Sequence, residues 1–240
     1  MTAPARYAVY LVPEPASALW RFGCDALGRD AVTGEPCSGF VIDRIDAKSW
    51  RELTAEPRRY GFHATLKAPF RLDAGRNTDE LFRAVAALAG AAAPFDAGPL
   101  GVSTIAVGRN RAFVALTPIA PSAELARLEG AVVRSLDAFR APLTEAERQR
   151  RDPERLTQRQ RETLEAWGYP YALDEFRPHF TLTNAIAGAE RIAAAMAREF
   201  ERRVASPLLR VDALALCAES GPERLFTIVR RFPLGGREAA

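Results

Sequence analysis

His63 and His179 are the only histidines of this 240-residue chain, and each begins the same short pattern. The first copy reads His-Ala-Thr-Leu over residues 63–66, and the second reads His-Phe-Thr-Leu over residues 179–182. Imidazole changes its charge near neutral pH, so it can both take up and release a proton during a reaction. Two copies that use every histidine of the chain indicate two halves of one acid–base active site.

The first copy lies in a β-rich stretch, for which we predict a strand from Tyr60 to Ala68 that ends at Pro69. Side chains alternate between the two faces of a strand. His63, Thr65 and Lys67 are therefore expected on one face, and the apolar residues between them on the other.

The second copy lies in a similar stretch, for which we predict a strand from Phe176 to Asn184. Alternation puts Arg177, His179, Thr181 and Thr183 on one face of that strand. A polar face that carries the repeated pattern thus recurs in both halves of the chain.

Side by side, two such faces would supply the groups that hydrolysis of a phosphodiester needs. One neutral imidazole takes a proton from the attacking water, and the other, protonated, gives a proton to the leaving alkoxide. The hydroxyls of Thr65 and Thr181 would donate hydrogen bonds to the non-bridging oxygens, and Lys67 and Arg177 could hold a phosphate by charge. The sequence does not decide which histidine is the base, and the mechanism requires no metal or cofactor.

Other chemistries have less support. The chain has no phosphate-binding G-x-x-x-x-G-K-[ST] loop, no G-x-G-x-x-G and no G-x-S-x-G elbow. A catalytic metal would need both histidines and additional carboxylates as ligands. The chain lacks the H-x-H and H-E-x-x-H spacings that present such ligands together. Cys24, Cys37 and Cys217 form no C-x-x-C pair and are expected to be reduced thiols, although a Cys–His pair formed in space stays open.

Composition favours a folded protein that acts on a small molecule. Hydrophobic residues make up 48% of the chain and charged residues 26%, with a net charge of +3. No long basic, aromatic-rich stripe is present, so a small phosphorylated substrate is favoured over RNA, which stays as an alternative partner. The arginine-rich segment from Thr144 to Arg161 is interpreted as a solvated helical face, with a lid or an interface as alternatives.

The expected location of the protein in the cell follows from the absence of a signal peptide and of a membrane-spanning segment in the sequence. Residues 1–12 do not have the charged start and long apolar core of a signal peptide, and no apolar run reaches the roughly 20 residues of a membrane-spanning helix. We expect a cytoplasmic protein without a membrane partner, and its oligomeric state stays open.

The elements that must position the two patterns follow from hydrophobic periodicity and from glycine and proline. Their order, strand then helix then strands in each half, predicts an α+β fold with antiparallel sheets. Helices are expected over residues 17–27, 47–53, 78–92, 121–139 and 189–204, with further helix between 144 and 167. Besides the two pattern strands, strands are expected over residues 6–12, 95–100, 101–107, 112–116, 208–216 and 225–232.

Paired His-x-Thr-Leu elements half a chain apart resemble the signature of the two-histidine (2H) phosphoesterase superfamily. More narrowly, the stretches at residues 60–70, 17–23 and 167–171 resemble a family encoded with bacterial phosphonate-degradation operons. The resemblance implies a single bilobal domain with a pseudo-twofold axis, a central groove between antiparallel sheets, and helices outside. We expect lobes of roughly 1–120 and 121–240, with exchange of terminal strands between them left open.

The resemblance also implies an activity. It carries catalytic roles onto His63 and His179 and phosphate-binding roles onto Thr65 and Thr181, for metal-independent cleavage of a cyclic phosphodiester. The operon implies a substrate such as a ribosyl 1,2-cyclic phosphate. Processing of RNA ends, with 2′,3′-cyclic phosphates or 2′-5′ linkages, and a non-catalytic phosphate-ester binding module are the alternatives.

Overall fold

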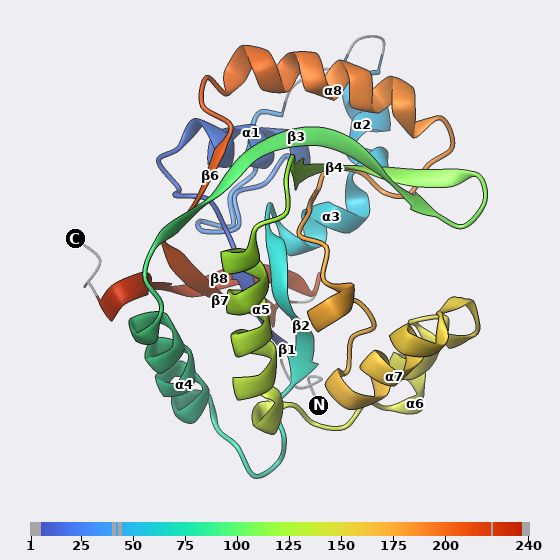
Figure 1. Cartoon of the computed structure of the whole chain (residues 1–240). Helices are drawn as coiled ribbons and strands as arrows, with labels where there is room; N and C mark the ends of the chain where they lie inside the picture. Colours follow the sequence, from blue (N-terminus) through green and yellow to red (C-terminus); the bar gives the residue numbers. More distant parts are fainter. Residues whose placement is uncertain (1–5, 40–41, 43–44, 222, 237–240) are drawn as a thin grey trace.

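Two four-stranded antiparallel sheets with helices packed around them form the fold (Figure 1). The computed structural model describes residues 6–39, 42, 45–221 and 223–236. The strand orders are β2-β1-β7-β8 in the first sheet and β5-β4-β3-β6 in the second. The predicted α+β class with antiparallel sheets is therefore confirmed.

The first sheet is built around β1 (Arg6–Leu11), which pairs with β2 (Ala64–Arg71) on one side and β7 (Ala213–Ser220) on the other. Residues 8–11 of β1 are all buried, because a central strand has a neighbour on each edge and packing on both faces. The outer strand β8 (Leu225–Pro233) pairs with β7.

The second sheet is built around β3 (Phe95–Val107) and β4 (Arg111–Pro118), which form a long hairpin. The short β5 (Phe180–Thr181) pairs with β4, and β6 (Leu208–Val211) pairs with β3. The two strands predicted over residues 95–107 are thus one continuous strand.

The strand predicted over residues 208–216 is two strands that belong to different sheets. β6 ends at Val211 in the second sheet, and β7 begins at Ala213 in the first. Each sheet therefore combines strands from both halves of the chain. The sheets do not follow a division into residues 1–120 and 121–240, and the division into lobes stays a prediction.

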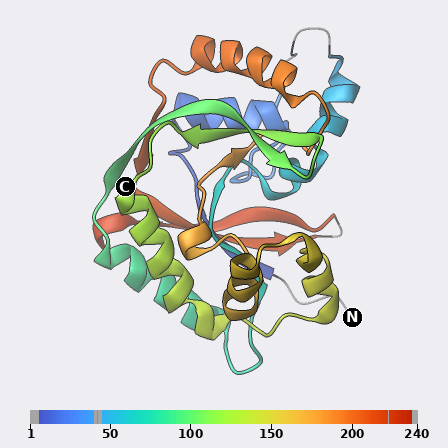
Figure 2. The ribbon, with the colours of Figure 1, turned by 45° about the vertical axis from the view of Figure 1, so that its right-hand side comes forward.

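Helices cover the outer sides of the sheets (Figures 1 and 2). In these views α8 runs along the β3–β4 hairpin, α4 and α5 pack at the first sheet, and α6 and α7 lie beyond the end of β2. Their bounds are α1 (Ala18–Leu27), α2 (Ala47–Leu53), α3 (Ala55–Tyr60), α4 (Thr78–Ala91), α5 (Ala123–Ser135), α6 (Glu145–Gln149), α7 (Gln158–Trp167) and α8 (Ala189–Arg203).

The termini of α1 agree with the signals in the sequence. The side chain of Ser17 accepts a hydrogen bond from the backbone N–H of Trp20, and Gly28 ends the helix in the left-handed conformation at φ 68°. Serine satisfies a free N–H of the first turn, and glycine adopts positive φ without strain.

Both pattern strands are shorter than predicted. Tyr60 ends α3, so β2 begins only at Ala64, and Pro69 lies inside the strand. The proline is tolerated because β2 is an edge strand, where one side needs no N–H donor. In the second copy only two residues pair with β4, because Pro178 lacks an N–H and restricts the residue before it.

Among the described residues, no helix combines the length and apolar character that spanning a bilayer requires. Residues 1–5, part of the stretch interpreted as not being a signal peptide, lie outside the described residues.

Candidate active site

His63 and His179 occupy the same local position in two different sheets. Each lies one residue before a strand, β2 in the first sheet and β5 in the second. The Nδ1 atom of His63 is 2.8 Å from the carbonyl oxygen of Gly61, and the Nδ1 atom of His179 is 2.7 Å from the carbonyl oxygen of Arg177. Each imidazole is thus held by the backbone two residues earlier.

This contact determines the tautomer of both rings. A carbonyl oxygen can only accept a hydrogen bond, so Nδ1 carries the proton in each histidine. In a neutral imidazole the other nitrogen, Nε2, then presents a lone pair. Both histidines therefore offer Nε2 as the atom that can accept a proton, or donate one once the ring is charged.

The fold brings the two copies of the pattern together. The rings of Phe62 and Phe180, which directly neighbour the two histidines in sequence, lie with their centroids 5.0 Å apart. The two copies of the pattern therefore lie side by side, and the sharing of one active site by the two histidines stays a prediction.

The threonines of the two patterns differ in their contacts. The hydroxyl of Thr65 lies 3.3 Å from Nε2 of His63, and donates to it when that nitrogen is unprotonated. Thr181 is partly buried on β5, opposite Ala115. Thr183 is fully buried, where its hydroxyl accepts from the backbone N–H of Val114 and donates to a backbone carbonyl. Thr183 therefore has a structural role.

An aromatic ring accompanies each histidine, and neither ring is marked by the sequence pattern. Tyr10 on β1 stacks on His63 with ring centroids 3.7 Å apart and lies opposite Thr65 in the sheet. Phe113 on β4 lies 5.4 Å from His179. The buried hydroxyl of Tyr10 has no hydrogen-bond partner among the described residues. Only the pairing of β1 with β2 reveals that Tyr10 belongs to this face.

Burial sets the charge state of the pair. It lowers the pKa of His63 to about 4, with a smaller contribution from His179, against the hydrogen bond to Gly61 that raises it. Burial also lowers the pKa of His179, and the bond to the Arg177 carbonyl again opposes it. Both imidazoles are thus neutral at pH 7 in the free protein.

The expectation that Lys67 shares a face with His63 and Thr65 is wrong. Thr65 pairs with Tyr10 while Lys67 pairs with Val9, so two steps along β2 match a single step along β1. This β-bulge reverses the alternation, and Lys67 points to the opposite face from Thr65.

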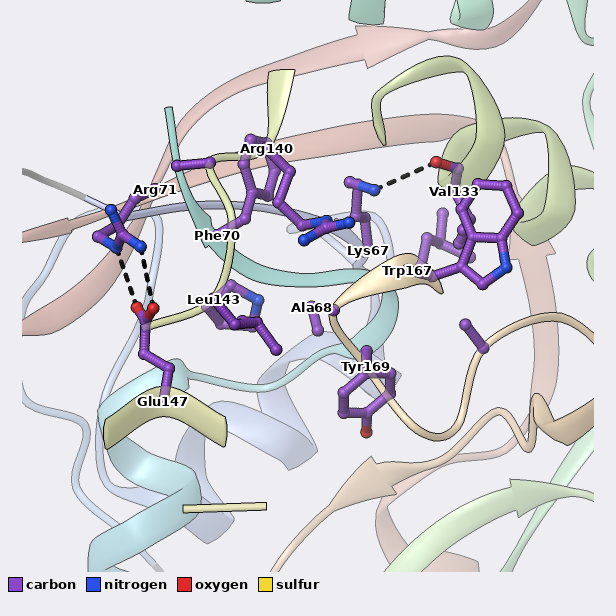
Figure 3. A pocket seen from close by; sticks show the side chains of 15 residues that line it. Lys67, Ala68, Phe70, Arg71, Val133, Arg140, Leu143, Glu147, Trp167 and Tyr169 are labelled. Atoms are coloured by element: carbon purple, nitrogen blue, oxygen red, sulfur yellow. Dashed lines mark hydrogen bonds and ion pairs between the residues drawn. The ribbon is translucent and has the colours of Figure 1, made fainter. Parts of the chain in front are cut away.

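On that face Lys67 is 4% exposed, and its ammonium group points to the carbonyl of Val133 (Figure 3). Its ammonium group donates to the carbonyl of Val133 near the end of α5, at 3.1 Å, and pairs with Asp137 at 3.2 Å. A cation at a helix C-terminus stabilises the free carbonyls there. Burial lowers the pKa of Lys67, which Asp137 partly offsets. The structure therefore gives Lys67 a packing role.

Arg177 contributes to this region through its backbone. Its carbonyl accepts the hydrogen bond of His179, and its side chain is exposed. A role of its guanidinium group in binding phosphate stays a prediction.

Cys24 and Cys217 are buried free thiols and Cys37 is a partly buried one, and burial raises the pKa of all three. Thiols held in the protonated form are poor nucleophiles, so a Cys–His pair has no support here. In the described ranges, no three His, Cys, Asp or Glu side chains gather as ligands for a metal ion would.

Residues 65–227 match the sequence profile of a family described as "Protein of unknown function (DUF1045)". The chain belongs to the DUF1045 family. The matched residues include Thr65, His179 and Thr181, and thus most of the two patterns.

Two longer curated proteins are similar to nearly the whole chain, and both are named ribose 1,5-bisphosphate phosphokinase PhnN. The one from Janthinobacterium sp. (strain Marseille) is 36% identical over 237 residues, which cover 97% of this chain and 51% of that protein. The one from Laribacter hongkongensis (strain HLHK9) is 34% identical over 232 residues, which cover 94% and 51%. The chain thus spans about half the length of these relatives.

Solved structures with a similar outline include TT0787 of Thermus thermophilus, at 14% identity and a TM-score of 0.48, covering 97% of this chain and 100% of the other. Another is LigT of E. coli complexed with ATP, at 14% identity and a TM-score of 0.43, covering 97% and 99%. Because these TM-scores lie below 0.5, the function of this family member has to be inferred from its own residues.

Proposed function

We propose that this protein is a metal-independent phosphodiesterase of the 2H type, which opens a small cyclic phosphodiester by acid–base catalysis between His63 and His179. The observation that carries the proposal is the matched geometry of the two imidazoles. Each is oriented by a backbone carbonyl two residues earlier, so that Nε2 is the reactive nitrogen of both. Each is followed two residues later by a threonine hydroxyl.

In the proposed reaction Nε2 of one neutral histidine takes a proton from a water molecule, whose oxygen attacks phosphorus. The bond from phosphorus to one sugar oxygen breaks, and the other histidine, protonated at Nε2, gives its proton to that oxygen. The product is an open phosphate monoester, and the protons on the two rings exchange with solvent. When the substrate binds, the hydroxyl of Thr65 turns from Nε2 of His63 to a non-bridging oxygen and Thr181 donates to another, where negative charge increases in the transition state.

The difference in pKa suggests a division of roles. His63 is stacked against Tyr10, and burial lowers its pKa to about 4. A proton on His179 makes protonation of His63 still less favourable. The first proton to bind this pair therefore goes to His179. We assign His63 as the base and His179 as the acid, with an anionic substrate between them raising both pKa values.

A small phosphorylated sugar or nucleotide is the substrate class that we propose. The relatives' name concerns a ribose bisphosphate, and this chain has no G-x-x-x-x-G-K-[ST] loop, so we assign the phosphokinase activity in their name to their other half. Three free thiols suit a reducing cytoplasm as the location.

The test is a panel of cyclic phosphates, including ribosyl 1,2-cyclic and nucleoside 2′,3′-cyclic phosphates, followed by phosphorus NMR with a chelator present. We expect one of them to be opened, with His63→Ala and His179→Ala each lowering kcat/KM by about 100-fold or more. Full activity in either variant would remove the mechanism. Binding without product would favour the non-catalytic module, and metal-dependent activity a metal enzyme.

The division of roles has its own test. A substrate with a p-nitrophenolate leaving group needs little help from an acid, because that anion leaves without a proton. His179→Ala should therefore lose much less activity on such a phosphodiester than on a sugar ester, while His63→Ala should lose the same on both. The reverse result would exchange the two roles.

A further inference from the structure

A pocket of about 400 Å³ lies beside the first histidine, and neither its role nor its ligand follows from the two patterns. Tyr60 at the end of α3 lines this pocket, and the ring centroid of Tyr60 is 6.2 Å from that of His63. Residues around the short helix α6 line another side, and α3 and α6 both lie to the right of β2 in Figure 1. The volume is in the range of small-molecule sites.

The lining is strongly basic. Four arginines reach the pocket from three separate parts of the chain, against two carboxylates: Arg6, Arg59, Arg150 and Arg151 face Glu56 and Glu147. We call this the arginine pocket. Convergence of arginines on one space is costly unless an anion is present, because like charges repel.

Two of the four arginines are held in place by one buried carboxylate. Glu219 is 5% exposed in its side chain and pairs with Arg6 and Arg59, each at 2.7 Å, and with Arg224 at 3.0 Å. Three guanidinium groups thus share one negative charge, which fixes their positions and leaves an excess of positive charge. These contacts hold the pKa of Glu219 well below its usual range, although burial opposes them.

The other two arginines have no such partner. Glu147 accepts hydrogen bonds from Nε and Nη2 of Arg71, at 3.1 and 3.0 Å, so the charge of Arg71 neutralises it. In the part of the chain that the structure describes, neither Arg150 nor Arg151 pairs with a carboxylate. The guanidinium of Arg151 instead lies 5.1 Å from the ring centroid of Tyr169. A partly buried guanidinium stacked on an aromatic ring keeps its donors available to a ligand.

We propose that the arginine pocket binds a terminal phosphate of the substrate, so that the substrate is a cyclic phosphodiester that also carries a phosphate monoester. This inference rests on the proposed function, in which the cyclic phosphate lies at His63, and Tyr60 joins the two sites. A dianionic phosphate monoester presents several acceptor oxygens to arginines that approach from different sides. The pocket then selects substrates by their second phosphate, while the histidines act on the first.

The experiment compares two probes that differ only in that group, adenosine 2′,3′-cyclic phosphate with and without a 5′-phosphate. We expect the wild-type protein to show at least about a tenfold higher kcat/KM for the 5′-phosphorylated probe, because hydrogen bonds between charged groups are the strong ones. Arg150→Gln and Arg151→Gln should each reduce this preference several-fold. The matched control is Arg155→Gln, an exposed arginine outside the pocket, which should keep the wild-type ratio.

The outcomes separate the two proposals. Equal kcat/KM for both probes overturns the arginine pocket and leaves the proposed function standing. Cleavage of neither probe counts against a nucleotide as the substrate and leaves the sugar cyclic phosphates of the panel to test the proposed function; the pocket is then decided by calorimetric titration with adenosine 5′-monophosphate and adenosine. Tighter binding of the monophosphate that Arg151→Gln weakens supports the pocket, and equal binding overturns it. A strong preference for an oligoribonucleotide with a 2′,3′-cyclic end would also overturn it, in favour of an RNA backbone.

Discussion

Gly23 in α1 lies directly against Phe62, the residue before His63, and its replacement by alanine should be costly. A Cβ atom at this position would lie 2.0 Å from Cγ and 2.1 Å from Cδ1 of the Phe62 ring. Carbon atoms in contact are about 3.5–4.0 Å apart, so the ring would have to move by about 1.5 Å. Phe62 is fully buried, with Trp20 and Phe180 around it at ring-centroid distances of 6.5 and 5.0 Å.

The magnitude follows from two opposing effects. Alanine is favoured over glycine inside a helix by about 1 kcal/mol, whereas overpacking a rigid core costs about 1–3 kcal/mol and more when the ring is displaced. We expect Gly23→Ala to lower the free energy of unfolding by about 2 kcal/mol. Because Phe62 is joined to His63, the variant should also lose more than half of its kcat/KM.

Gly90 in α4 is the matched control, since a Cβ atom there meets nothing within 4 Å. Gly90→Ala should keep the wild-type activity and raise the free energy of unfolding by up to about 1 kcal/mol. Urea denaturation of the three proteins measures the differences. If Gly23→Ala is as stable as Gly90→Ala, the close packing of α1 on Phe62 is not a constraint and the reasoning is refuted.

Three further results are expected. With His63 as base and His179 as acid, kcat/KM should depend on pH as a bell-shaped curve, with its acid limb near pH 4 and its alkaline limb below pH 6.5. A rate that stays constant from pH 6 to 8 would contradict the two lowered pKa values. Because the pKa of His63 in the folded protein is below the unfolded value of 6.5, the unfolded protein binds more protons between these two pH values. The free energy of unfolding should therefore fall by up to about 3 kcal/mol from pH 6.5 towards pH 4. Urea denaturation of His63→Gln should not show this part of the fall. Lys67→Met should lower the free energy of unfolding by about 1–3 kcal/mol, because the contacts to Val133 and Asp137 are lost, and should change kcat/KM by no more than about twofold. A rise in KM alone would instead show that Lys67 binds the substrate.

Signals that act within a few residues could be read from the sequence. The bounds of α1 and α2 follow from local preferences: α1 begins one residue after the predicted start, and α2 has the predicted bounds. The repeated His-x-Thr-Leu pattern likewise indicates both histidines as candidates, because two rare residues in matching surroundings need no knowledge of the fold.

Contacts between strands could not be read in this way. The bulge at Leu66 that turns Lys67 away from the histidines exists only in the pairing of β2 with β1. The same pairing brings Tyr10 onto His63. The arginine pocket is lined by residues from β1, α3 and the end of α6, which are far apart in the sequence, so no local pattern could predict it.

The hydrogen bonds from the two imidazoles to their own backbone affect what mutagenesis can find. In a serine-protease triad a carboxylate orients the histidine, and replacing that side chain changes the tautomer. Here the orienting acceptors are the carbonyls of Gly61 and Arg177, which every amino acid possesses. Replacement of Arg177 by alanine should therefore leave the Nδ1–H tautomer of His179 unchanged, so a loss of activity in that variant reports on the guanidinium group and not on the orientation of the ring.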